Sequence, residues 1–228
     1  MKTAIPALLV AVALAAPAAA QRPPQRPPVR APAPPPLPPA PPISFRPFVV
    51  GTEESFAAID TFDAGFGHTY GPFFGGGLQV LFRDRFYLEL GASRFKQTGQ
   101  RAFLSGGRPF RVGIPLTATI TPLEVTGGYR FRLRRLPRVR PYVGAGFGSY
   151  GYRETSEFSD AGENVDTRHS GTVLNGGAEF RLHRWVGLGA DVQYTHVPGI
   201  LGLGGVSQQA GENDLGGVAV RVKLVVGR

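Results

Sequence analysis

The residues that could do chemistry are few and scattered along the chain. There is no cysteine, which excludes a thiol nucleophile, a thiolate metal site and a lipidated cysteine. The acidic segment Glu157–Asp166 is interpreted as a solvated loop rather than a cation site. No two of the four histidines have metal-ligand spacing, and we therefore predict neither a metal nor a cofactor; they are His68, His169, His183 and His196.

An enzyme would need a nucleophile, a base and an orienting acid at one place. His196 and Ser207 flank the last long connection. His169 and Ser170 are adjacent, and adjacent residues of a strand point to opposite faces, so these two cannot pair. The run Gly202–Gly205 precedes neither a Lys-Ser/Thr pair nor a predicted helix and does not predict a phosphate loop. We predict that the protein is not an enzyme, with surface catalysis as the less favoured alternative.

Charged side chains recur at alternate positions of apolar stretches. Between residues 127 and 152 the chain reads GGYRFRLRRLPRVRPYVGAGFGSYGY. Tyr129, Phe131 and Leu133 share one face, and Arg130 and Arg132 share the other. A two-residue period indicates a strand with unlike faces. The polar faces of all such stretches together carry Glu53, Gln79, Glu89, Glu124, Arg130, Arg132, Asn175, Glu179, Arg181, Asp191, Gln193, Arg221 and Lys223.

The formal net charge of +9 raises the question of nucleic-acid binding. Outside the proline-rich leader, however, the arginines fall at strand ends and on alternating positions rather than in one block. Strands with one polar and one apolar face explain this mixture of aromatic and basic residues. We therefore predict no nucleic-acid partner.

The strands that position these charges form a repeat. In four copies a Gly-Gly pair leads an alternating strand, and the connections that follow on one side are only a few residues long. The opposite connections, at 56–71, 104–109, 154–168 and 199–214, are longer. One strand, three hairpin pairs and a last strand make eight. The sequence thus predicts an all-β fold, an eight-stranded antiparallel up-and-down transmembrane β-barrel.

Three regions are expected along the chain. Residues 1–20 read as a secretory signal peptide, with Lys2 before the apolar run Ala7–Ala16 and an A-x-A arrangement before Gln21. Residues 21–43 are proline-rich and are expected to form a disordered leader, with a tether or partner ligand as the alternative. Residues 44–228 are assigned to the barrel.

The orientation of the two faces decides what the charges do. In a membrane barrel the apolar face points to lipid and the lumen is polar, whereas a soluble barrel has the reverse arrangement. Eight strands enclose a lumen that side chains fill, and charges packed so closely must be paired. We predict that Arg130 pairs with Glu124 or Glu179. The expected lumenal charge network comprises Glu89, Glu124, Arg130, Arg132, Glu179, Arg181, Asp191, Arg221 and Lys223.

An exported, cysteine-free, glycine-rich eight-strand pattern with PYVGAGFG at Pro141–Gly148 resembles the OmpA-, OmpX- and OmpW-like outer-membrane barrels. The resemblance implies an outer-membrane location, with short turns in the periplasm and long loops outside. It also implies contact with outer-membrane lipid and lipopolysaccharide, with the barrel-insertion machinery, and with surface partners through the long loops.

The function expected on this basis is that of a non-enzymatic outer-membrane protein, structural or surface-interacting, with a charge-paired lumen. The first alternative is a narrow channel for small or hydrophobic solutes. The second is a soluble periplasmic lipocalin-like ligand binder.

Overall fold

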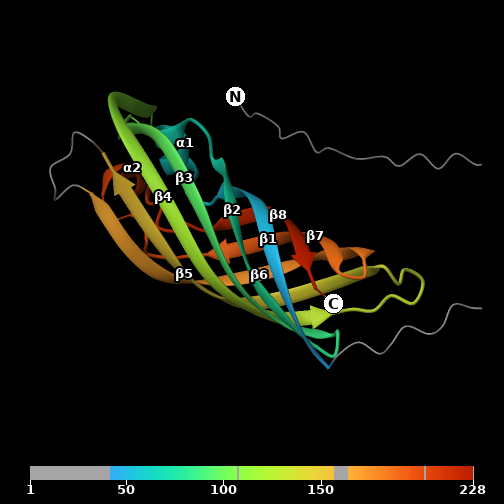
Figure 1. Ribbon diagram of the computed structural model, residues 1–228. Coiled ribbons are helices and arrows are strands. Elements are labelled where there is room, and N and C mark those ends of the chain that lie inside the picture. Colours follow the sequence, from blue (N-terminus) through green and yellow to red (C-terminus); the bar gives the residue numbers. More distant parts are fainter. Residues whose placement is uncertain (1–41, 107, 157–163, 203, 228) are drawn as a thin grey trace, which may run out of the picture. The chain divides into compact units, whose positions relative to one another are not determined.

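Eight antiparallel strands form a closed barrel, in which each strand pairs with the next and the last pairs with the first (Figure 1). The computed structural model describes residues 42–106, 108–156, 164–202 and 204–227. The predicted signal peptide, all but the end of the predicted leader, and residues 157–163 of the acidic segment lie outside these residues. The predicted fold class is confirmed. The strands are β1 (Ile43–Phe56), β2 (Tyr70–Phe82), β3 (Phe86–Ser105), β4 (Arg108–Arg130), β5 (Val139–Thr155), β6 (Val165–His183), β7 (Val186–His196) and β8 (Gly217–Val226).

The two ends of the barrel differ in their connections. We call the end with the connections 83–85, 131–138 and 184–185 the turn side, and the opposite end the loop side. Arg83 and Asp84 both have positive φ, at 52° and 55°, as the two central residues of a tight hairpin turn require. This turn places the Asp84 carboxylate at the turn-side mouth of the barrel.

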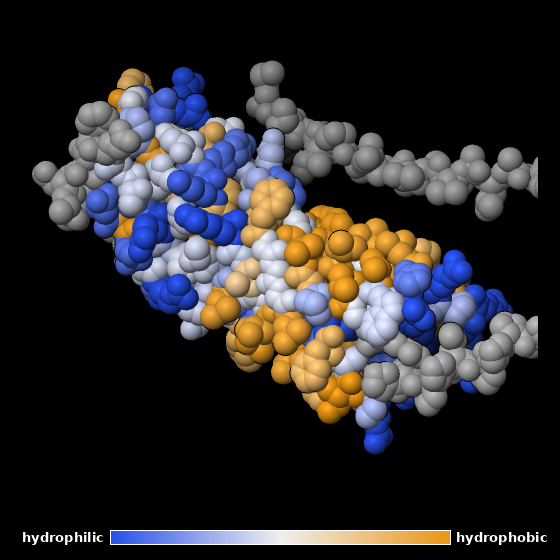
Figure 2. Space-filling model, in the orientation of Figure 1, coloured by the Kyte–Doolittle hydropathy of each residue, from blue (hydrophilic) through white to orange (hydrophobic). Residues whose placement is uncertain are grey.

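The strands are unequal in length. β3 and β4 have 20 and 23 residues, whereas β7 and β8 have 11 and 10. A transmembrane strand needs roughly 9–11 residues. The longer strands therefore extend well beyond one bilayer thickness on the loop side. Figure 2 shows the same division on the surface, with an apolar zone bordered by two hydrophilic ends.

The alternation of faces is as predicted for most strands. Apolar side chains point outward, with Phe147 73% exposed and Val220 57% exposed. On β1, however, Phe48 is buried inside the barrel and Glu53 is exposed. The prediction that Glu53 faces the lumen is therefore wrong. Arg46 and Phe48 show which positions of β1 point inward. Glu53 is an odd number of residues away from both and therefore points outward.

The long connections are not simple loops. The connection between β1 and β2 contains α1 (Ile59–Phe66), and the connection between β7 and β8 contains α2 (Gly205–Ala210). The expectation that no helix begins at the glycine run 202–205 is wrong, because α2 starts at Gly205. Within the described part of the chain, no helix is long and apolar enough to cross a membrane.

Candidate functional site

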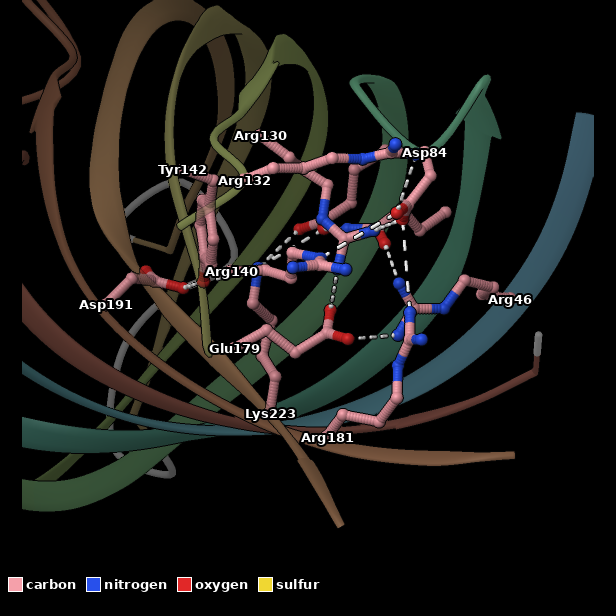
Figure 3. A network of polar contacts seen from close by, with 12 residues as sticks. Arg46, Asp84, Arg130, Arg132, Arg140, Tyr142, Glu179, Arg181, Asp191 and Lys223 are labelled. Atoms are coloured by element: carbon pink, nitrogen blue, oxygen red, sulfur yellow. Dashed lines mark hydrogen bonds and ion pairs between the residues drawn. The ribbon is translucent and has the colours of Figure 1, made fainter. Parts of the chain in front are cut away.

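The turn-side half of the lumen is filled by paired charges (Figure 3). The Arg130 guanidinium lies between two carboxylates, 3.1 Å from Asp84 and 3.0 Å from Glu179. Glu179 also accepts a 2.6 Å hydrogen bond from Arg46. The side chains of Arg46, Arg130 and Glu179 are each 5% exposed or less. Burial of unpaired charge is costly, so each of these groups depends on its partners.

The network continues toward the loop side through alternating acid and base. Gln79 bridges the two parts, since it accepts a hydrogen bond from Arg46 and donates one to Glu89. The Lys223 ammonium lies 3.2 Å from Glu89 and 3.2 Å from Asp191. Asp191 in turn accepts a 2.6 Å hydrogen bond from Arg221. Because these residues come from different strands, the network ties distant parts of the barrel wall together across the lumen.

Glu124 forms the loop-side end of the network. It accepts a 2.7 Å hydrogen bond from the Tyr150 hydroxyl and a 3.1 Å bond from the Gln193 amide. Its nearest basic group is Arg221, at 3.9 Å. Of the two partners predicted for Arg130, the structure places Glu179 beside it, while Glu124 contacts other groups.

Two of the predicted lumenal residues lie instead at the turn-side mouth. Arg132 follows the end of β4 and is 3.3 Å from Asp84, with a side chain that is 49% exposed. Arg181 is 4.0 Å from the same carboxylate and 43% exposed. Both belong to an arginine cluster around Asp84 rather than to the buried network. The other predicted network residues, Glu89, Glu124, Arg130, Glu179, Asp191, Arg221 and Lys223, point into the lumen.

Sequence reasoning missed several members of the network. Arg46 sits in a short stretch before the first clear alternation, and Asp84 lies in a turn, where a charge is usually solvated. Arg140 is 3.7 Å from Asp84. Tyr142 is also absent from the predicted network, although its hydroxyl donates a 2.5 Å hydrogen bond to Asp191. Alternation from Val143 and Phe147, which face outward, would have placed Tyr142 on the inner face. The parity predicted from Glu53, in contrast, puts Arg46 on the outer face.

Glycines make room for large side chains that cross the lumen. Tyr87 reaches from β3 and donates a 3.1 Å hydrogen bond to Asn175 on β6. A Cβ atom at Gly128 or Gly144 would collide with the Tyr87 ring or hydroxyl. These glycines are therefore required by close approach rather than by backbone conformation.

The loop-side half of the lumen has a different filling, an apolar core. Phe56 stacks on Phe62 of α1, with ring centroids 3.8 Å apart, and Phe95 packs edge-on against Phe56 at 5.5 Å. α1 thus enters the barrel mouth with its apolar face. The buried residues of this loop-side core are Phe56, Ala58, Phe62, Phe73, Phe95, Ala118, Ile120, Tyr150, Tyr152, Val173, Val197, Ile200, Leu201 and Leu215.

Charged side chains from elsewhere hold both ends of α1. The residue before the helix is Ala58, which offers no side-chain cap. The Glu212 carboxylate instead accepts the backbone N–H groups of Asp60 and Thr61, each at 2.9 Å. At the other end the Arg111 guanidinium donates to the carbonyl oxygens of residues 63 and 64. An acid at the helix N-terminus and a base at its C-terminus both complement the helix dipole.

A cavity of about 530 Å³ lies at the loop side, lined by both helices and by strands β3 to β6. Phe66, Leu116 and Tyr152 give it an apolar lining, and Arg101 and Glu154 add charged groups. The volume is in the range of small-molecule sites.

The predicted catalytic candidates are not brought together. His196 Nδ1 lies 2.6 Å from Asp214. The Ser207 hydroxyl accepts from the Gly202 N–H and donates to the Gly204 carbonyl oxygen, both at 3.0 Å. His196 and Ser207 therefore each have a local structural partner of their own.

Asp214 anchors the last long connection. Burial opposes its ionisation, but hydrogen bonds from the N–H groups of Val197 and Gly216 and the contact with His196 outweigh this, and the pKa of Asp214 is lowered. Among the described residues, no group of three or more His, Asp or Glu side chains could hold a metal ion.

A closed barrel with an apolar outer belt, a polar turn-side lumen and an even number of antiparallel strands defines a transmembrane β-barrel. The family model described as "Outer membrane protein beta-barrel domain" matches residues 44–224. The chain belongs to this family, and it is a protein of the outer membrane. The soluble lipocalin-like alternative is therefore wrong.

Several solved structures resemble the chain. OprG from Pseudomonas aeruginosa has a TM-score of 0.48 at 12% identity, with 82% of this chain and 95% of that chain covered. The N-terminal β-barrel domain of Pseudomonas aeruginosa OprF has a TM-score of 0.46 at 11% identity, with coverages of 81% and 97%. Ail from Yersinia pestis, in complex with the heparin analogue sucrose octasulfate, has a TM-score of 0.46 at 13% identity, with coverages of 81% and 96%. No curated protein matches the sequence.

Proposed function

We propose that the protein is a closed, non-enzymatic outer-membrane barrel that acts as a structural or surface-interacting element, with its turn side in the periplasm. The observation that carries this proposal is the double filling of the lumen. Paired charges from Asp84 to Glu124 occupy the turn-side half, and the loop-side core occupies the other. Solutes would have to displace both fillings in series to pass.

The loop side is the part available to partners. β3 to β6 continue beyond the apolar belt, and their outer surface carries exposed charge such as Arg94 and Lys96. Residues held rigidly on strands are better placed for recognition than residues on free loops. This supports a surface-interacting role through the loop-side extension.

Single-channel recording in planar bilayers tests the closed lumen. Folded protein, identified by heat-modifiable migration in gels, is expected to give no steady conductance steps in concentrated KCl. A porin inserted in the same bilayer serves as the positive control. Steady open steps from the folded, unmodified protein would contradict the proposal and favour a narrow channel.

The second candidate function is binding of a small apolar solute, and the loop-side cavity of about 530 Å³ favours it. Displacement of an apolar fluorescent dye by candidate solutes measures such binding. Leu116→Trp would fill the cavity from its wall and is expected to abolish dye binding. Val125→Trp, outward-facing on the same strand, is the matched control. Equal dye binding by both variants would rule out the cavity as the site.

A further inference from the structure

The turn side carries an unbalanced ring of positive charge. Six arginines of its connections are exposed and form no ion pair with a described acidic residue. We call this group the turn-side rim; it consists of Arg83, Arg85, Arg134, Arg135, Arg138 and Arg184.

The described part of the chain offers these arginines no counter-charge. Within the described turn-side connections the single carboxylate is Asp84, which is only 12% exposed and already lies within 4.0 Å of four other arginines. The preceding residues 21–41 contain three more arginines and no acid. Like charges at this density repel one another, so the rim is arranged for an anionic partner from outside the chain.

Apolar side chains place the rim at a definite depth. Each arginine of the rim lies within two residues in sequence of an exposed apolar residue. Arg184 lies 5.9 Å from the ring of Trp185, which is itself 46% exposed. Aromatic residues border the apolar belt of membrane barrels at the headgroup level. The other neighbours are Phe82, Phe86, Leu133, Leu136 and Leu182.

We propose that the turn-side rim binds the phosphate groups of anionic phospholipids in the leaflet that meets the turn side. Arginine binds phosphate with paired, charge-assisted hydrogen bonds, and its long stem lets the guanidinium reach the headgroups from the edge of the apolar belt. The exposed apolar residues beside these arginines favour a lipid surface over a soluble acidic partner or the carboxylates of the cell wall. The proposal rests on the outer-membrane location and is independent of whether the lumen is closed.

The single tryptophan of the chain provides a local probe, because Trp185 lies in the rim. Full-length protein is refolded into vesicles of phosphatidylcholine containing either brominated phosphatidylglycerol or brominated phosphatidylcholine. The ratio of quenching by the two lipids measures how strongly phosphatidylglycerol is enriched over phosphatidylcholine around Trp185. The attraction between one arginine and anionic lipid at a membrane surface corresponds to an enrichment of that lipid by about fivefold. We expect a quenching ratio of about this size.

A charge-matched pair of variants tests the assignment. Arg135→Gln/Arg138→Gln/Arg184→Gln is expected to bring the ratio close to one. Arg94→Gln/Lys96→Gln/Arg108→Gln removes the same charge from the loop side and is expected to keep it. The two lipids are compared within each variant, so any direct effect of Arg184 on Trp185 fluorescence cancels.

The unmodified protein alone also tests the proposal. Rising salt should reduce the ratio, because screening weakens exposed ionic contacts. A ratio of one at low salt, or an equal loss in both triple variants, would overturn the proposal. Arginine-dependent sedimentation with purified cell-wall sacculi, together with a ratio of one, would assign the rim to the cell wall instead. Conductance plays no part in this readout, so a failure of the closed-lumen proposal remains distinguishable.

Discussion

On the turn side the barrel is apolar outside and charged inside, whereas on the loop side it is charged outside and apolar inside. β3 shows the change within one strand. Its outward residues run from Leu88 and Leu90 to Arg94 and Lys96, while its inward residues run from Glu89 to Phe95. The inversion on both faces occurs at the same height of the strand. One closed sheet thus contains a membrane-type section and a soluble-type section.

The difference follows from the solvent around each section. In the bilayer the outer face must be apolar, and the narrow lumen can hold polar groups only if they satisfy one another. Beyond the bilayer the outer face meets water, so burial of apolar side chains inside becomes the main source of stability. In Figure 2 the hydrophilic end at the upper left, where Figure 1 places α1 and α2, corresponds to this second section.

The largest expected effect comes from breaking the charge network at its most shared acid. Glu179→Ala leaves Arg46 and Arg130 buried without that partner. Loss of one member of a buried ion pair costs about 3–5 kcal/mol. Denaturant unfolding in detergent, followed by heat-modifiable migration, should show this loss in the free energy of unfolding of the whole barrel. Glu53→Ala, on the outer face of β1, is the control. Similar stability of the two variants would show that the network does not hold the turn side.

The second effect is expected to be confined to the loop side. Phe62 of α1 is 2% exposed, and its removal as Phe62→Ala leaves a cavity in the loop-side core at a cost of about 3 kcal/mol. Hydrogen exchange should then increase in α1 and the loop-side strand ends, while the turn side keeps its protection. Ile59→Ala, on the exposed face of the same helix, is the matched control. A uniform loss of protection throughout the barrel would argue against two separable sections.

The period of two was enough to predict the strand number and most inward positions. It works because a barrel wall has only two faces, so parity decides the environment of each side chain. It failed at Glu53, where the aromatic Phe48 points inward in spite of the apolar-out rule. A single apolar residue carries little information on orientation where the interior contains rings such as Tyr87 and Tyr142.

The partners within the lumen were less predictable than the faces. Arg130 meets Glu179 and Asp84, which are 49 and 46 residues away in sequence, because the shear of the barrel fixes which heights coincide. α1 escaped prediction for a similar reason. Its N-terminal cap is the distant Glu212, and neither residue carries a local signal for the other.

The smallest expected effect concerns the base of the last long connection, on the loop side. The pKa of Asp214 is lowered in the folded protein, so its contribution to stability is present above its usual pKa of about 3.8 and is lost as the pH falls through the folded-state value. The pair with His196 is partly exposed, which limits this contribution to below about 1 kcal/mol.

Cleavage by an acid-active protease within residues 197–216 should therefore accelerate at low pH. Asp214→Asn keeps an acceptor for the Val197 and Gly216 N–H groups and should remove this pH dependence, whereas Asp166→Asn, in an exposed pair with Arg153, should keep it. Because neither the charge network nor the loop-side core includes Asp214, the turn side should be unchanged in the same experiment. Loss of turn-side protection in Asp214→Asn would show that the two sections unfold as one.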